Sequence, residues 1–220
     1  MAPTGEQPGD QGVLARHRLV EYLRRNNGQG AMSGEAIQAI GAVPREFFVP
    51  PRFAELAYAD EALQLEPGAT ISAPSMVAVM LTALEPKPGM RVLEIGAGSG
   101  YAAAVFAAAG MEVTAVEILA ELVRKARDAV ARAGWGGRVV IEAGDGMGGW
   151  PARAPYDRVV ASAAIEAVPQ AWLDQLAPGG IVLYPESREG EWDVLVRLRR
   201  LGDDWGREDL QVCKFVPMQH

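Results

Sequence analysis

The residues 91–100, RVLEIGAGSG, constrain the fold of this chain more than any other segment. The apolar run at their start is typical of a strand covered on both faces in a parallel sheet. Three glycines follow at once, and glycine lets the backbone approach a ligand closely because it has no Cβ. The alanine-rich segment 101–109 then predicts a helix that ends at Gly110. A buried strand, a glycine turn and a helix are therefore expected in succession.

A second apolar run, 113–116, ends at Glu117. Glu117 lies 21 positions after Gly96, and an acid about 20 residues beyond such a turn can reach the hydroxyls of a ribose held over it. The strand, the turn, the helix, the second strand and the acid together predict one half of a doubly wound sheet that binds a nucleoside.

The glycine spacing distinguishes between classes of nucleotide. A dinucleotide turn has the form G-x-G-x-x-G, whereas here the sixth position is Tyr101. A carboxylate just before the turn opposes a pyrophosphate and favours a cation, and S-adenosylmethionine carries a sulfonium and an ammonium without any phosphate. The pattern resembles class I methyltransferases, and an ordinary glycine-rich turn is the alternative. The residues expected to bind this cofactor are Glu94, Gly96, Gly98, Gly100 and Glu117.

The turn Gly144-Asp145-Gly146 follows the third predicted strand. In a parallel sheet it lies beside the loops at the carboxyl ends of the first two strands. Asp145 can therefore accept a hydrogen bond from the adenine amino group, with Gly146 beside it. The alternative is an Asp-Gly turn that requires a positive backbone angle.

Helices and strands alternate from residue 90 onward, which implies a parallel sheet. The last two strands, 194–198 and 210–216, are expected to form a closing hairpin whose charged loop is long enough to be mobile. The other expected strands are 138–142, 156–162 and 180–184. The expected helices are 12–27, 34–40 (capped by Ser33), 74–84 and 119–133, with a short helical turn at 53–58.

The composition favours a cytoplasmic enzyme. The chain has 220 residues, a net charge of −7 and one cysteine, Cys213. The acidic balance disfavours a nucleic-acid partner, and the single cysteine fits a reducing compartment. The first ten residues are polar and predict no secretory signal. The longest apolar run, 101–111, is too short to span a bilayer, so we expect no membrane partner.

Several segments resemble the protein-L-isoaspartate O-methyltransferase family, over roughly residues 30–220. The resemblance implies an α/β fold: a doubly wound, mostly parallel, seven-stranded Rossmann-like methyltransferase sheet with an N-terminal helical addition. We expect a disordered tail at 1–11 and one domain at 12–220, in which 12–89 is the helical, substrate-binding part and 90–220 the cofactor-binding sheet. The matching segments are VPREFFVP (43–50), AYAD (57–60), GATISAP (68–74), VLEIGAGSGY (92–101), GDG (144–146), APYDRVV (154–160), VPQAWLDQLAPGG (168–180) and KFVPM (214–218).

The family's reaction transfers the methyl group of S-adenosyl-L-methionine to the α-carboxylate of an isoaspartyl residue and leaves S-adenosyl-L-homocysteine. That carboxylate is already ionised at neutral pH, so the reaction needs no strong base, and we expect no metal. The methyl ester then cyclises to a succinimide, which starts the repair of the damaged protein. The resemblance implies isoaspartyl peptides and proteins as partners, and we expect a monomer.

The resemblance also implies roles for particular residues. Ser72, in T-I-S-A-P, is expected to position the substrate carboxylate; its alternative role is to cap the following helix. Ala69, Thr70 and Ile71 are expected near the methionine end of the cofactor. The segment 214–218 is expected to close over the cofactor or, alternatively, to pack as an ordinary strand. The residues expected to offer backbone to a peptide, or else to pack in the core, are Val43, Pro44, Val168 and Pro169.

The chain departs from the family's common pattern at Ser75, at Met147 and at 185–188. These positions border the expected peptide groove, so they leave methyl transfer secure and weaken the case for repair. A methyltransferase of aspartate carboxyls in one dedicated precursor peptide is the alternative enzyme. A non-catalytic binding module would be expected to lack Ser72, Glu117 or Asp145. A nucleic-acid methyltransferase would need a base-gripping motif in place of the small residues 161–164.

Overall fold

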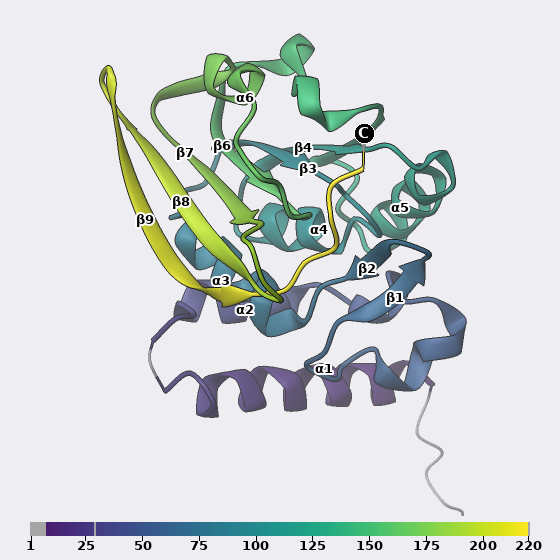
Figure 1. Ribbon diagram of the computed structural model, residues 1–220. Helices are drawn as coiled ribbons and strands as arrows, with labels where there is room; N and C mark the ends of the chain where they lie inside the picture. The colour runs from purple at the N-terminus through teal and green to yellow at the C-terminus, as the bar shows by residue number, and fades with distance from the viewer. Residues whose placement is uncertain (1–7, 29, 220) are drawn as a thin grey trace, which may run out of the picture.

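The computed structural model describes residues 8–28 and 30–219. In that part of the chain, a seven-stranded sheet has the order β5-β4-β3-β6-β7-β8-β9 (Figure 1). The first five strands in this order are parallel, and β8 and β9 are antiparallel to their neighbours. The expected doubly wound sheet is confirmed. The strands are β3 (Arg91–Ile95), β4 (Glu112–Glu117), β5 (Val139–Ala143), β6 (Tyr156–Ala161), β7 (Leu176–Glu186), β8 (Asp193–Leu201) and β9 (Asp204–Cys213).

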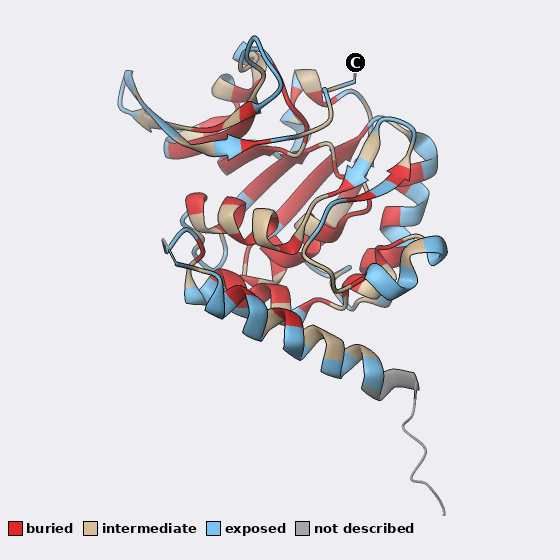
Figure 2. Cartoon of the chain, turned by 60° about the horizontal axis from the view of Figure 1, so that its bottom comes forward, coloured by how far each residue is buried: buried red, intermediate tan, exposed pale blue. Residues whose placement is uncertain are grey.

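Helices cover both faces of the sheet (Figure 1). The strand β3 shows the division, because its side chains alternate between two cores. Val92 packs with α2, α3, α4 and α5 in the larger core, while Leu93 and Ile95 pack with α6 in the smaller one. Figure 2 shows the strands buried between these layers. The helices are α2 (Gly34–Ala42), α3 (Pro74–Ala83), α4 (Tyr101–Ala108), α5 (Ala120–Arg132) and α6 (Gln170–Asp174).

The N-terminal addition begins with α1 (Pro8–Arg25). Leu19 and Leu23 are buried in the larger core, while the outer face of α1 is exposed (Figure 2). The helix starts four residues before the expected boundary, so residues 8–11 do not belong to a tail; residues 1–7 lie outside the described part of the chain. The predicted cap of α2 is confirmed, since the Ser33 side chain accepts a hydrogen bond from the Ala36 N–H.

A small hairpin, β1 (Leu63–Glu66) and β2 (Ala69–Ile71), precedes α3. The sequence predicted no strand at these residues. Gly68, in the turn between the two strands, has a φ of 78°. Leu63, Leu65 and Ile71 are buried in the larger core. The hairpin therefore sets where the segment leading into α3 lies.

The closing hairpin differs from the expectation. We expected a long charged loop between 198 and 210, but β8 and β9 run through those residues and meet at the turn between Leu201 and Asp204. The charged side chains pair across the ladder, as Arg197 does with Glu208. Cross-strand pairs of opposite charge stabilise an edge hairpin with little apolar cover, which is why the apolar pattern failed there.

The strand β7 also differs, because it starts at Leu176 instead of residue 180 and includes a turn at 178–179. Its pairing with β6 is irregular at this place. Gly179 has a φ of 71°, so the turn is absorbed as an irregularity within the strand.

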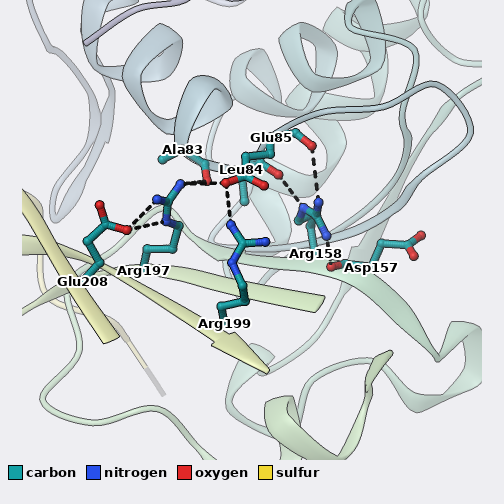
Figure 3. A network of polar contacts seen from close by, with 8 residues as sticks. All are labelled: Ala83, Leu84, Glu85, Asp157, Arg158, Arg197, Arg199 and Glu208. Carbon is teal, nitrogen blue, oxygen red and sulfur yellow. Dashed lines mark hydrogen bonds and ion pairs between the residues drawn. The ribbon is translucent and has the colours of Figure 1, made fainter. Parts of the chain in front are cut away.

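Arginines from β6 and β8 hold the carboxyl end of α3 (Figure 3). Arg197 and Arg199 also pair with the Glu85 carboxylate. Positive charge at this end complements the helix dipole. Arg158 and Arg197 donate hydrogen bonds to the last carbonyl groups of the helix, those of Ala83, Leu84 and Glu85.

No helix within 8–28 and 30–219 is long and apolar enough to cross a bilayer. A cluster of three or more potential metal ligands is likewise absent from those residues.

Candidate active site

A cavity lies at the carboxyl ends of the parallel strands, where open α/β sheets bind their ligands. The glycine turn, the end of β4 and the turn after β5 form three of its walls. The hairpin β1–β2 and the residues after β9 complete it. Its lining consists of Gly68, Ala69, Thr70, Ile95, Gly96, Gly98, Val116, Glu117, Ile118, Leu119, Gly144, Gly146, Ser162, Ala163, Val216, Pro217, Met218 and Gln219.

The glycine turn adopts backbone angles that favour glycine. Gly96, Gly98 and Gly100 have φ angles of 84°, 55° and 81°, a region that L residues with a side chain rarely adopt. A Cβ on Gly100 would lie 3.0 Å from Val130 in α5. Gly96 and Gly98 line the cavity, whereas Gly100 opens α4 and packs against α5.

Glu117 is buried at the end of β4. Its Oε2 accepts a hydrogen bond from the Gly98 N–H at 2.8 Å, and its Oε1 accepts one from the Leu119 N–H at 2.9 Å. These bonds fix the carboxylate between the turn and the start of α5. Each carboxylate oxygen has a further acceptor site, so the group can also accept hydrogen bonds from a ribose.

Glu94 is fully buried in β3 and does not line the cavity itself. Its Oε1 accepts a hydrogen bond from the Ser162 hydroxyl at 2.8 Å, and its Oε2 has no partner among the described residues. Burial raises the pKa of Glu94 to about 8, the Ser162 hydrogen bond opposes the rise, and the charge of Glu117 adds to it. A cation beside this carboxyl would favour its ionised form.

Ser162 is a site residue that the sequence reasoning missed. It lies directly after β6 and lines the cavity, and it connects the cavity wall to Glu94. Its position at the carboxyl end of a central parallel strand was the available signal. It stands among the small residues 161–164, which hid the significance of its hydroxyl.

Asp145 lies at the rim of the cavity. It is exposed, and its Oδ1 accepts a hydrogen bond from the Met147 N–H at 2.9 Å. The neighbouring residues Gly144 and Gly146 line the cavity. Gly146 has no positive φ. The alternative interpretation, an Asp-Gly turn that requires a positive φ, is therefore wrong. A Cβ there would clash with the Ile95 side chain, so close packing against β3 favours the glycine.

Two further side chains hold the 144–150 turn in place. The Trp172 Nε1–H donates to the Gly146 carbonyl at 2.8 Å. The Gln175 amide donates to the Gly148 carbonyl and accepts from the Trp150 N–H. Both residues lie in the segment 168–180, which resembles the family, but the sequence predicted no role for them. Both act from the region of α6, on the face of the sheet opposite α3.

The segment 69–73 runs from the cavity into α3. Ala69 and Thr70 line the cavity, whereas Ile71 is buried in the larger core. Ser72 is half-buried, and the cavity lining ends two residues before it. Helix α3 begins after Ala73, which has no side-chain cap. The capping role of Ser72 is therefore wrong.

An acid from another loop caps α3 instead. Asp60 Oδ1 accepts a hydrogen bond from the Ser75 N–H at 2.8 Å. The Ser72 hydroxyl makes no hydrogen bond within the described part of the chain, while the Ser72 carbonyl accepts one from Arg45 at 3.1 Å. The hydroxyl therefore remains available to a ligand.

The proposed peptide-binding residues are not arranged as one strand edge. Val43 is buried, its N–H bonds to the Ile40 carbonyl, and a 3-10 helix (Arg45–Phe47) follows Pro44. Val168 packs against the smaller core and Pro169 precedes α6. Strand-like pairing over 43–49 is therefore excluded by the local geometry, and core packing explains Val43.

The residues after β9 form a wall of the cavity. Ala164 donates to the Val216 carbonyl at 2.8 Å, and Met218 donates to the Ala164 carbonyl at 2.9 Å. Residues 216–219 line the cavity opposite the glycine turn. The two bonds form a parallel β-bridge between Ala164 and Pro217, so the segment packs locally as a strand and also lines the cavity.

The fold and the glycine turn define a Rossmann-like methyltransferase domain. The family model described as protein-L-isoaspartate(D-aspartate) O-methyltransferase matches residues 15–220. The chain belongs to this family.

Curated relatives are similar over nearly the whole chain. The protein-L-isoaspartate O-methyltransferase of Methylorubrum extorquens (strain PA1) is 41% identical over 99% of this chain and 93% of its own length. The enzyme of the same name from Pyrobaculum neutrophilum is 42% identical over 92% of this chain and 98% of its own. Protein-L-isoaspartate O-methyltransferase 2 of Anaeromyxobacter sp. (strain Fw109-5) is 41% identical over 93% and 83%.

Solved structures share the fold. A protein-L-isoaspartate O-methyltransferase superposes with a TM-score of 0.83 at 27% identity, over 93% of this chain and 66% of the other. A Plasmodium falciparum protein in complex with S-adenosyl-L-homocysteine superposes with a TM-score of 0.78 at 22% identity, over 92% and 97%. The second match, at this identity, bears on the fold alone.

Proposed function

We propose that this chain transfers a methyl group from S-adenosyl-L-methionine to the α-carboxylate of L-isoaspartyl residues in damaged proteins and peptides. The observation that carries the proposal is the cavity, in which the glycine turn and Glu117 lie against the segment that leads to Ser72. Family membership supplies the reaction and the substrate class.

The residues of the cavity fit this cofactor. Glu117 would accept hydrogen bonds from the ribose, while Gly144 and Gly146 would lie beside the adenine, with Asp145 at the rim. The unpartnered oxygen of buried Glu94 fits a cationic ligand nearby, because ionisation of that carboxyl requires a compensating positive charge. Thr70 and Ala69 would contact the methionine end.

The cofactor supplies a methyl group bonded to a positively charged sulfur. A substrate carboxylate oxygen forms the new bond to the methyl carbon as the carbon–sulfur bond breaks, and the bonding electron pair goes to the sulfur. The products are a methyl ester and the neutral thioether S-adenosyl-L-homocysteine. Because the carboxylate is already ionised, the protein contributes alignment of the reacting atoms.

Ser72 is the residue we assign to that alignment. Its hydroxyl is free of intramolecular bonds within the described residues, and it lies two residues from the cavity wall at Thr70. A hydroxyl there would donate a hydrogen bond to one substrate carboxylate oxygen and direct the other toward the methyl group.

A pair of peptides tests the proposal. The purified chain should methylate an isoaspartyl hexapeptide and should ignore the same peptide with a normal aspartyl residue. Equal labelling of both would favour the alternative, an aspartate-carboxyl methyltransferase with one precursor peptide. Absence of labelling on either would refute carboxyl methylation.

We also propose that the protein acts as a monomer in the cytoplasm, without nucleic acid, membrane or metal. The acidic composition and the single cysteine support this setting. Light scattering at several protein concentrations and metal analysis of the purified chain would test it.

A further inference from the structure

Arg45 is a fully buried cation in the 3-10 helix that follows α2. Burying a guanidinium is costly unless its donors are satisfied. Its two terminal nitrogens donate to carbonyl oxygens alone, and its Nε has no partner in the described part of the chain. Burial lowers its pKa, opposed by the nearby Asp60 and Glu61. The hydrogen bonds to those carbonyls therefore stabilise the buried guanidinium of Arg45.

The four carbonyls belong to two separate segments. Nη1 donates to Ala57 at 2.9 Å and to Ala59 at 3.3 Å, in the loop before β1. Nη2 donates to Glu61 at 3.1 Å in the same loop and to Ser72 at 3.1 Å. Because the guanidinium is a rigid, planar fork, it fixes the Ser72 carbonyl relative to that loop.

A second bond joins the same two segments. Asp60, which lies between the carbonyls that Arg45 binds, accepts a hydrogen bond from the Ser75 N–H. The residues 72–75 are therefore held at a carbonyl by Arg45 and at an amide by Asp60, on either side of the start of α3.

Arg45 also lies against the cofactor turn. Its guanidinium carbon is 5.4 Å from the centre of the Tyr101 ring, and Tyr101 is the first residue of α4, directly after Gly100. A Cβ on Gly98 would lie 3.7 Å from the Thr70 carbonyl oxygen. One buried side chain thus touches the start of α4 and binds the segment that carries Ser72.

We propose that Arg45 is a positioning residue of the methyl-transfer site, which fixes the backbone of Ser72 relative to the glycine turn. The inference rests on the proposed function for its effect on turnover. It predicts that Arg45 governs the rate on the peptide substrate without governing the affinity for the cofactor, because none of its contacts lies in the cavity lining.

The chain offers a matched control, Arg158. It too is buried, and it too donates to carbonyl oxygens, at the opposite end of α3. Arg45→Met and Arg158→Met therefore remove the same group from the two ends of one helix. Loss of stability is expected in both variants, whereas loss of positioning is expected in only one.

Three measurements separate these effects: thermal unfolding, calorimetric binding of S-adenosyl-L-homocysteine, and kcat and KM on the isoaspartyl hexapeptide. For Arg45→Met we expect kcat to fall about 100-fold, the size of a misplacement of about 1 Å, with cofactor affinity unchanged. For Arg158→Met we expect a lower unfolding temperature and unchanged kcat. Equal kcat in Arg45→Met and wild type would overturn the proposal.

Amide hydrogen exchange gives a readout that does not depend on activity. We expect faster exchange at residues 70–75 in Arg45→Met and not in Arg158→Met. If the wild type proved inactive on the peptide, the proposed function would fail while this measurement still tested the role of Arg45. Unchanged exchange over 70–75 would overturn that role.

A second pair of variants covers the case in which Arg45→Met does not fold. Asp60→Ala removes the acceptor of the Ser75 N–H, and Asp60→Asn keeps an oxygen there. We expect kcat to fall in Asp60→Ala and to recover in Asp60→Asn. If neither variant changed kcat, the Asp60 link would have no part in the reaction, which would contradict the proposal that this loop positions residues 72–75.

Discussion

Two buried arginines hold the two ends of α3, and their surroundings differ. Arg45, at the amino end, is sealed in the core and binds four carbonyls from two loops. Arg158, at the carboxyl end, lies beside the partly exposed ion pairs of Glu85 with Arg197 and Arg199 (Figure 3).

The difference between the two ends follows from what each has to hold. The carboxyl end needs positive charge, which any nearby cation supplies through the helix dipole. The amino end needs a fixed backbone position, because the segment beside the cofactor turn leads into it. Buried Arg158 also donates to neutral carbonyls at the carboxyl end, but Arg197 and Arg199 add partly exposed ion pairs there that salt can screen. The bonds of Arg45 lie wholly in the core, where its rigid fork fixes position.

Ser72→Ala sharpens the comparison at the amino end. We expect kcat on the isoaspartyl peptide to fall roughly 10- to 100-fold, the value of one hydrogen bond to a charged group. Cofactor affinity should stay near that of the wild type. Steady-state kinetics with calorimetry would measure both, and a variant with the wild-type rate would remove Ser72 from the reaction.

Glu117→Ala tests binding of the cofactor, where Ser72→Ala tests the rate on the peptide. The change removes an acceptor fixed by the Gly98 and Leu119 amides. We expect binding of S-adenosyl-L-homocysteine to weaken by about 1–3 kcal/mol. Calorimetric titration would measure the loss, and Glu121→Ala, on the exposed face of α5, provides the control. Equal affinity in the two variants would contradict the ribose assignment.

Glu94 contacts the cavity wall through the Ser162 hydroxyl, and we expect it to make cofactor binding depend on pH. With a pKa of about 8 its carboxyl is mostly protonated at pH 7, and a cationic ligand should draw the proton off. We expect cofactor binding to release up to about one proton at pH 7 in the wild type and none in Glu94→Gln. Titrations in two buffers with different ionisation enthalpies would measure the release.

The raised pKa of Glu94 also predicts how the free energy of unfolding changes with pH. The native state binds more protons than the unfolded state between the ordinary pKa of a glutamate and about 8, so Glu94 makes the protein less stable as the pH rises through that range. Glu94→Gln should remove this slope. Denaturant unfolding at several pH values would show it, and parallel curves for the two proteins would be contrary to the burial of a carboxyl.

The carboxyl end of α3 should give the smallest effect. Arg199→Ala removes one partly exposed ion pair with Glu85, and we expect a loss of about 0.3–1 kcal/mol of unfolding free energy at low salt. Added salt should reduce the loss, and kcat should not change. A fall in kcat here would break the comparison, since both ends of the helix would then govern the reaction.

The parts of the fold that sequence predicted have strong local signals. The unit from Arg91 to Gly110 joins an apolar strand, positive-φ glycines and an alanine-rich helix, so each element points to the same structure. The hairpin 193–213 lacks that agreement. Its strands are held by charge pairs such as Arg207 with Glu186. A run of charged residues without apolar alternation predicts a loop, so the pattern did not indicate these strands.

The site was predicted unevenly for the same reason. Glu117 follows from a fixed distance after a glycine turn, whereas Arg45 contradicts the rule that charged side chains stay at the surface. Ser162 and Trp172 act through single bonds to Glu94 and Gly146, which only the folded structure brings together. Gly146 lines the cavity, as its predicted place beside the cofactor requires, and its alternative role in a positive-φ turn is wrong because its φ is not positive.

The cavity wall has a consequence for how the protein matures. Gly68 and Gln219 lie on one cavity, joined by a bond from the Gln219 amide to the Gly68 carbonyl. A chain whose last strands have not yet docked therefore has no complete pocket for the nucleoside. A ligand stabilises only the state that binds it. Bound nucleoside should therefore stabilise the fully folded chain and leave partly folded chains without that stabilisation.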